Sequence, residues 1–272
     1  MQRRYTISYS FLILLCATLV LPANGGSTDR LQSGRTIYIG AEARNDWPPF
    51  EFFQREDGKP TEKIVGYTID VLNEIFSKHR IEYDFRAYPW ARCLSNLVSG
   101  EKIQMVLPAS LDEERRSKYL ISDTVYTITP SFFYLKKNYP NGLKIKSPED
   151  FLTYSEICGR HGYNYVNFGL ENEKVKRYSK NFKSLISMLK KNRCHIVLAR
   201  YEVMAGHGLL GTSYLNDEIG YAPVPGVPPE SFHFMISKNY PHGDALLKII
   251  NSGILRLRKQ GRLKKILKKY IP

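Results

Sequence analysis

Apolar and polar residues follow two different periods along this chain of 272 residues. They alternate over residues 36–41 and 81–87, which is typical of half-buried strands. A continuous apolar run at residues 103–107 predicts a fully buried strand. Further short β-prone runs lie at residues 131–135, 195–198 and 232–236.

Helices are predicted where apolar residues recur every three or four positions. These stretches are residues 66–78, 94–99, 183–190 and 244–270. Gly100 ends the second of them, and Gly253 and Gly261 interrupt the last. Ser147 followed by Pro148 is a strong signal for a further helix start. Because strands and helices alternate along the chain, we expect an α/β fold built in layers.

One stretch, residues 88–126, combines these elements with candidate chemistry. Trp90 and Arg92 precede the predicted helix at residues 94–99, which leads to the buried strand. Ser110 follows that strand, and Asp112 begins a second helix. In open α/β sheets, ligands bind where strands end and the next helices begin. Arg115 in this place can hold a carboxylate through two N–H groups, and Trp90 offers a flat face for stacking.

The motifs of this stretch are Trp-x-Arg, then Ser-x-x-Glu-Glu-Arg, then Tyr-Leu-Ile-Ser-Asp-x-x-Tyr. Together they resemble the bacterial extracellular solute-binding proteins of family 3, the polar-amino-acid type. The resemblance implies that Arg115 grips the carboxylate of the ligand and that Ser110 and Trp90 line the site. It also implies no catalysis, cofactor or metal.

A second part of the resemblance is the Pro-Phe-Glu-Phe stretch at residues 49–52. In the family, an aromatic residue two positions before this proline stacks on the ligand, and Trp47 holds that place. Pro48 and Pro49 exclude helix, so Trp47 projects from a rigid loop at a strand end. The alternative is that Trp47 packs in the core.

The fold implied by the resemblance is a two-domain periplasmic binding protein of the Venus flytrap type, with the ligand cleft between its domains. We expect the first domain at residues 36–128 plus 235–272 and the second at residues 129–234. Two hinge strands are expected near residues 129–134 and 231–235.

The second domain is expected to contribute residues from a glycine-containing loop and from the end of a strand. The candidate ligand-binding residues are therefore Trp47, Trp90, Arg92, Ser110, Arg115, Arg160, Gly162, Tyr163 and Arg200. For Arg92, the alternative is that it braces Trp90 or pairs with an acid.

Arg200 departs from the family pattern. Members that hold an α-ammonium group have an acid at this position, and an arginine cannot hold an ammonium group. Either Glu202 or Asp46 takes over that role, or the ligand is no ordinary zwitterion. We favour a ligand with excess negative charge or one without an amine.

The N-terminus predicts export. Arg3 and Arg4 precede an apolar run at residues 11–21 that is too short to span a membrane, as in a secretory signal peptide. We expect residues 1–25 to be cleaved and the protein to be periplasmic; an uncleaved anchor is the alternative. Three cysteines then remain. Cys158 and Cys194 could pair and leave Cys93 as a buried thiol, or all three could be unpaired.

The net charge of +14 is concentrated near the C-terminus. Eight basic residues and no acid lie between Arg256 and Lys269. Nucleic acid is no expected partner of an exported protein, so we expect a helix that packs on the first domain and exposes a basic face. A membrane-bound amphipathic helix is the alternative.

The sequence therefore predicts an exported, monomeric protein that captures a small carboxylate-bearing solute, amino-acid-like or an organic anion, for an ABC permease. Two alternatives remain. One is a ligand-sensing subunit of a membrane receptor. The other is an enzyme of the same fold, similar to cyclohexadienyl dehydratase, for which Glu51 and Glu202 are the candidate acids. No histidine pair has the spacing of metal ligands.

Overall fold

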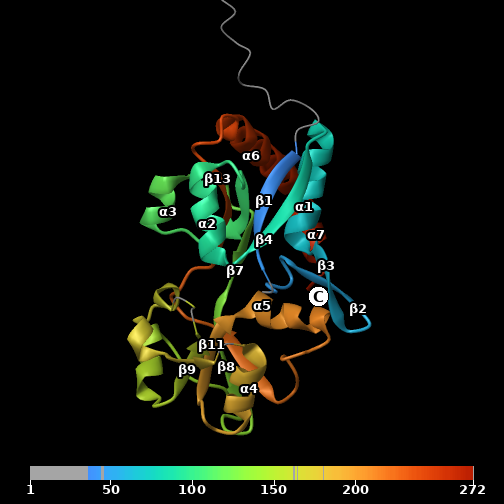
Figure 1. Cartoon of the computed structure of the whole chain (residues 1–272). Helices are drawn as coiled ribbons and strands as arrows, with labels where there is room; N and C mark the ends of the chain where they lie inside the picture. The colour runs from blue at the N-terminus through green and yellow to red at the C-terminus, as the bar shows by residue number, and fades with distance from the viewer. Residues whose placement is uncertain (1–35, 44–45, 162, 164, 180, 272) are drawn as a thin grey trace, which may run out of the picture.

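The protein is described by a computed structural model that covers residues 36–43, 46–161, 163, 165–179 and 181–271. Two main sheets divide it into two halves (Figure 1). The first sheet has the strand order β4 (Glu82–Tyr88), β1 (Thr36–Glu42), β5 (Met105–Ala109), β13 (Glu230–Ser237) and β6 (Tyr119–Ile121), and β7 (Tyr126–Ile128) also pairs with β13. In this sheet β1 runs parallel to β4 and β5, whereas β13 is antiparallel to its neighbours.

The second sheet has the order β10 (Lys176–Ser179), β9 (Ile157–Arg160), β11 (Ile196–Arg200), β8 (Pro130–Leu135) and β12 (Ile219–Pro223). Its helices are α4 (Phe182–Lys190), α5 (Tyr201–Gly206) and the 3-10 helices η2 (Pro148–Thr153), η3 (Val166–Phe168), η4 (Asn172–Lys174) and η5 (His207–Leu210). Strand β9 runs parallel to β10 and β11, so the carboxyl ends of β9 and β11 meet at one edge. Figure 1 shows this half below the first sheet.

The first half also contains five α-helices, one 3-10 helix and a hairpin within the described residues. They are α1 (Tyr67–Phe76), η1 (Ser77–His79), α2 (Trp90–Ser99), α3 (Glu113–Lys118), α6 (Gly243–Lys259), α7 (Arg262–Leu267), and the hairpin of β2 (Phe52–Glu56) with β3 (Lys59–Val65). All five residues of β5 are buried, as the continuous apolar run predicts for a central strand.

The chain crosses between the halves at Thr129, after β7, and at residues 224–229, before β13. The hinge segments expected at residues 129–134 and 231–235 overlap β8 and β13, and each of these strands is paired within one sheet. Strand β13 belongs to the first sheet over its whole length, so the change of half precedes residue 230.

The halves touch where α5 meets the loop after β1. A Cβ added to Gly206 would come within 2.6 Å of Pro48 and Pro49, so only glycine allows this approach. Trp47 from the same loop contacts the ring of Tyr163 in the second half, with 5.8 Å between ring centroids. The two halves are therefore in contact beside the ligand cavity described below.

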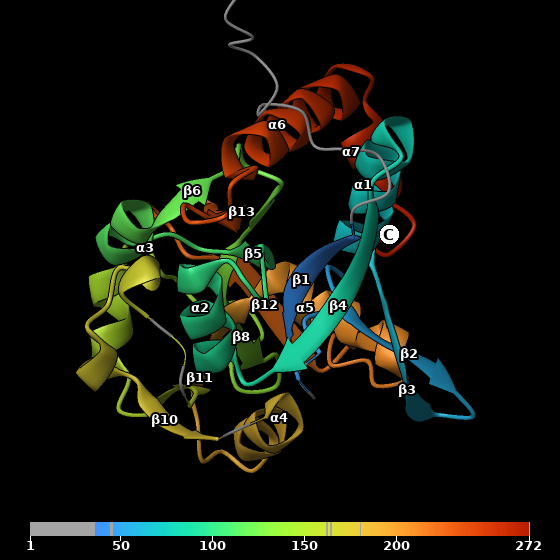
Figure 2. The same cartoon turned by 45° about the horizontal axis from the view of Figure 1, so that its top comes forward.

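The C-terminal helices pack on the first half, as predicted. Helix α6 continues through Gly253, however, where the sequence predicts an interruption. Gly253 lies against Ile75 of α1 so closely that an added Cβ would come within 2.6 Å of its side chain. Arg262 pairs with Glu74, Arg256 Nη2 donates to the carbonyl of Glu74 at 2.9 Å, and Lys269 Nζ lies 2.9 Å from Asp70 Oδ2. Three of the basic residues therefore bind α1. Figure 2 shows α6 and α7 beside α1.

Cys158 and Cys194 form a disulfide, with Cα atoms 5.8 Å apart, so the paired alternative is confirmed. Cys93 is a free, fully buried thiol that contacts the carbonyl of Ala41, and burial raises its pKa. The predicted signal peptide, residues 1–25, lies outside the described residues. Among the helices that are described, none has the length and apolar character needed to cross a membrane.

Candidate ligand-binding site

A cavity of about 280 Å³ lies between the two halves. It is bounded by the carboxyl ends of three strands: Glu42 ends β1, Ser110 follows β5, and Arg200 ends β11. Its walls are made by Ala41, Glu42, Trp47, Glu51, Phe52, Phe53, Ile64, Trp90, Leu107, Pro108, Ala109, Ser110, Arg115, Tyr163, Arg200 and Phe232. Because parallel strands end at a common edge, this is where an α/β fold offers side chains and backbone N–H groups to a ligand.

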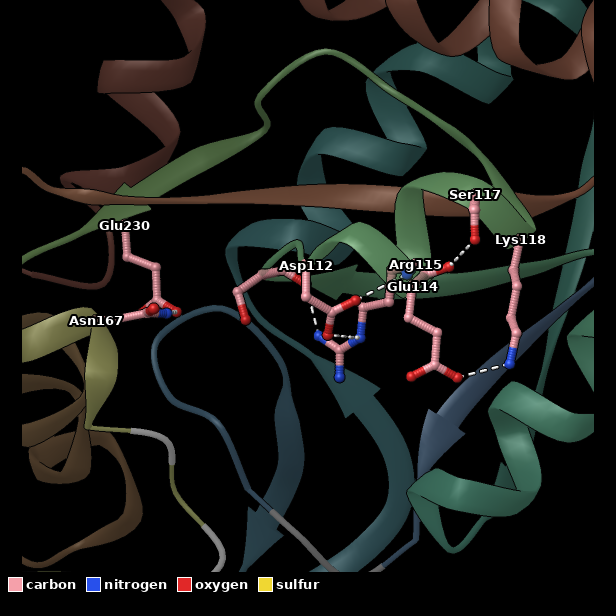
Figure 3. A network of polar contacts seen from close by, with 8 residues as sticks. Asp112, Glu114, Arg115, Ser117, Lys118, Asn167 and Glu230 are labelled. Carbon is pink, nitrogen blue, oxygen red and sulfur yellow. Dashed lines mark hydrogen bonds and ion pairs between the residues drawn. The ribbon is translucent and has the colours of Figure 1, made fainter. Parts of the chain in front are cut away.

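Arg115 is held in place by the loop that precedes α3. Asp112 caps this helix and accepts a hydrogen bond from the backbone N–H of Arg115 at 2.8 Å. The guanidinium donates from Nη1 to the carbonyl of Ser110 at 2.6 Å, and its Nε lies 3.6 Å from Asp112 Oδ2 (Figure 3). Arginine has five N–H donors, so this arrangement orients the guanidinium and leaves donors for a ligand. Both Ser110 and Arg115 line the cavity, and their contact with a ligand stays a prediction.

Trp47 packs against its neighbours and also lines the cavity, while its stacking on a ligand stays a prediction. Its backbone N–H donates to the carbonyl of Glu51 at 2.8 Å, which closes the turn at Pro48 and Pro49. Its ring stacks on Phe232, with 6.0 Å between centroids, and both residues line the cavity. The residue is therefore packed in an aromatic cluster and also forms a wall of the site.

Two of the predicted arginines do not line the cavity. Arg92 is exposed on α2, and its guanidinium lies 5.0 Å from the ring centre of Tyr88. Arg160 donates from Nη1 to the hydroxyl of Tyr163 at 2.6 Å, so it contacts a residue that lines the cavity. Trp90 and Tyr163 do line the cavity. Gly162 lies outside the described residues.

Arg200 lines the cavity and is already paired. Its side chain is only 6% exposed, and Nε donates to Glu230 Oε2 at 2.8 Å. The other oxygen of Glu230 accepts a hydrogen bond from Asn167 Nδ2 at 2.6 Å. The argument from Arg200 for an excess of negative charge on the ligand assumed an unpaired cation. Because Glu230 compensates the charge of Arg200, that argument no longer holds.

The acids named for an ammonium group are used elsewhere. Asp46 pairs with Arg55 at 2.6 Å, and Glu202 accepts hydrogen bonds from the backbone N–H and the hydroxyl of Thr129 at 2.7 and 2.8 Å. Neither lines the cavity. The carboxylates that do so are Glu42 and Glu51. Glu42 was missed, although it ends the alternating strand of residues 36–41 and so lies at the same sheet edge.

Glu51 is partly buried beside the cavity and accepts a hydrogen bond from the hydroxyl of Thr68 at 2.9 Å. Burial raises the pKa of this carboxyl from its ordinary value of 4.5 to about 8. Loss of solvation disfavours the carboxylate more strongly than this single hydrogen bond favours it. Glu51 is therefore mostly protonated at neutral pH.

Replacing Glu51 with glutamine is expected to reduce the dependence of stability on pH. Native Glu51 keeps its proton between about pH 5 and 8, where the unfolded chain loses it, so the free energy of unfolding falls as the pH rises. At pH 8, we expect the free energy of unfolding of Glu51→Gln to exceed that of the wild type by roughly 1–3 kcal/mol. Urea denaturation at several pH values measures this, with exposed Glu218→Gln as the control. If the free energy of unfolding changed with pH in the same way for Glu51→Gln and the wild type, the prediction would be wrong.

Among the described residues, no three histidine, cysteine, aspartate or glutamate side chains are grouped so that they could hold a metal ion.

Several known proteins are similar to this chain over most of its length. A probable histidine-binding protein of Neisseria gonorrhoeae is 21% identical over 94% of this chain and 92% of its own length. A substrate-binding protein of an ABC uptake transporter from Streptococcus pneumoniae, solved with bound histidine, has a TM-score of 0.64 and 19% identity, covering 86% of this chain and 92% of that one. An ancestral amino-acid-binding protein, described as a precursor of cyclohexadienyl dehydratase, has a TM-score of 0.64 and 20% identity, covering 87% and 96%.

These likenesses confirm the predicted two-domain periplasmic binding protein fold. A family model matches residues 39–272, which is nearly all of the chain that the structure describes. The chain belongs to the bacterial extracellular solute-binding proteins, family 3.

Proposed function

We propose that this protein captures a small carboxylate-bearing solute, amino-acid-like or an organic anion, and delivers it to an ABC-type permease. The orientation of Arg115 carries the proposal. Its guanidinium is directed by Ser110 and Asp112 and lines a cavity whose other walls are largely apolar and include several aromatic rings. A planar carboxylate matches the paired N–H groups of a guanidinium, and a partly enclosed site strengthens that contact.

The aromatic walls suit the rest of the ligand. Trp47, Trp90, Tyr163 and Phe232 line the cavity from both halves of the molecule. A ligand that touches both halves stabilises the closed arrangement, because it makes all its contacts only there. Closure is then the signal that a permease recognises. We propose that the protein acts as a monomer and requires no cofactor or metal ion.

The ligand need not lack an amine. Glu230 compensates the charge of Arg200, and Glu42 lines the same cavity from the end of β1. An ammonium group bound near Arg115 would meet a carboxylate there. Amino acids are therefore included in the proposed class together with organic acids.

The proposed location is the periplasm, reached through the signal peptide at residues 1–25. The family description, extracellular solute-binding proteins, supports export. A membrane receptor that detects the bound ligand would recognise the same closed arrangement. Identifying the membrane partner, and not the ligand, therefore distinguishes a sensing subunit from a transport protein.

One observation favours a second candidate, a dehydratase of cyclohexadienyl acids. Glu51 lines the cavity and carries a pKa raised to about 8, which suits a group that donates a proton at neutral pH. Incubation with such acids, followed by chromatography, separates the two functions. We expect the acids to be recovered unchanged. Formation of an aromatic product that depends on Glu51 would show catalysis.

A thermal-shift screen of the exported form tests binding. We expect at least one amino acid or small organic acid to raise the melting temperature by several degrees, since a ligand at 100 times its Kd stabilises the native state by about 2.7 kcal/mol. The methyl ester of each ligand found is the control, because it loses the carboxylate charge and adds only one methyl group. Equal shifts from acid and ester would contradict a carboxylate site.

A further inference from the structure

The ion pair between Arg200 and Glu230 joins two parts of the fold. Arg200 ends β11 of the second sheet, whereas Glu230 begins β13 of the first. Asn167, from the second half, donates to the remaining oxygen of Glu230, and Figure 3 shows these two side chains meeting. The Arg200 and Glu230 side chains are 6% and 7% exposed. Such burial makes each charge depend on the other for compensation.

The two members of the pair face different spaces. Arg200 lines the ligand cavity, and Glu230 does not. Glu230 and Asn167 instead line a second cavity of about 450 Å³, next to the crossing segment at residues 226–229. Seen from the ligand cavity, Glu230 therefore lies behind Arg200. A ligand meets the guanidinium but not the carboxylate that neutralises it.

Arg200 can still donate hydrogen bonds to a ligand. Within the described residues, its side chain makes a hydrogen bond from Nε alone. Its terminal N–H groups can serve a neutral acceptor such as a hydroxyl, an amide oxygen or a carbonyl. A second carboxylate in the same place would lie close to the buried negative charge of Glu230, and like charges in a poorly solvated site repel strongly.

We propose that Glu230 determines specificity by keeping the Arg200 wall electrically neutral. The ligand class is then a monocarboxylate that binds Arg115 through its carboxylate and Arg200 through a neutral hydrogen-bond acceptor. Dicarboxylates of the same shape are disfavoured. This inference rests on the proposed function, because it takes Arg115 as the primary carboxylate site.

Glu230→Gln tests the inference, since glutamine keeps the shape of the side chain and removes its charge. Calorimetry with the matched pairs glutamine and glutamate, and succinamate and succinate, measures selectivity. We expect the wild type to bind at least one amide at least tenfold more tightly than the matching diacid. In Glu230→Gln this ratio should fall at least tenfold, mainly because the diacid binds more tightly.

Two control variants separate charge at this position from other effects. Glu218→Gln removes an exposed acid of the second half that pairs with Lys190, and it should leave the ratio within about twofold of wild type. Asn167→Ala removes a hydrogen bond to Glu230 and keeps every charge, so it should also preserve the ratio. A loss of selectivity in Asn167→Ala equal to that in Glu230→Gln would overturn the charge argument.

Binding measurements on the wild type alone also test the inference. If it binds a diacid as tightly as the matching amide, the inference is wrong and the carboxylate-binding function stands. If it binds neither pair nor any other carboxylate, both fail together. Should Glu230→Gln not fold, the wild-type ratio and Asn167→Ala still test the inference, because both retain the native ion pair.

Discussion

Replacing Arg115 with alanine is expected to weaken binding of a carboxylate ligand by roughly 10- to 150-fold. Hydrogen bonds to charged groups contribute about 1.5–3 kcal/mol each, and 1.4 kcal/mol corresponds to a tenfold change in affinity. Arg115 is oriented by Ser110 and Asp112, so a ligand finds its guanidinium already in place. Isothermal titration calorimetry with a ligand from the thermal-shift screen measures the effect.

The adjacent arginine provides the control for this prediction. Arg116 is exposed and lines the second cavity instead of the ligand cavity. Arg116→Ala removes the same charge one residue away, so we expect an affinity within about threefold of wild type. Equal losses in the two variants would mean that long-range charge, and not contact with Arg115, controls binding.

Removing the disulfide is expected to produce the largest change in stability. Cys158 and Cys194 are separated by 36 positions, and closing a loop of this length reduces the entropy of the unfolded chain. The variant with alanine at both positions should lose about 3–4 kcal/mol in its free energy of unfolding, measured by urea denaturation. The bond joins β9 to the segment before β11, the strands that end at Arg160 and Arg200.

Reducing agent provides the control for the disulfide. Dithiothreitol should lower the stability of the wild type towards that of the variant and should not affect the variant, whose remaining thiol within the described residues, Cys93, is buried and unpaired. A variant as stable as the oxidised wild type would show that the bond contributes little, for example because the unfolded state is already compact.

Elements with a strong period were predicted well. The alternating run at residues 36–41 is β1, and the helix predicted to end at Gly100 is α2. The helix start at Ser147 is present with Asp150 in a capping box, but it leads into the short 3-10 helix η2. Strands β10 and β12 were not predicted, because short edge strands owe their conformation to pairing with a neighbour more than to their own residues.

By itself, the sequence determined the parts of the site that are built by one continuous segment. The strand, the loop at Ser110, the cap at Asp112 and the position of Arg115 all follow from neighbouring residues. The resemblance identified the family from the same stretch. Local signals suffice here because strand ends and helix caps are formed by interactions within a few residues.

Only the tertiary structure decided the electrostatics of the opposite wall. Arg200 and Glu230 are 30 positions apart and belong to different sheets, and no periodicity or motif joins them. The raised pKa of Glu51 likewise depends on the residues packed around it. Charge compensation and desolvation depend on which groups fold next to one another, so the sequence could identify Arg200 as unusual but could not show that its charge is neutralised.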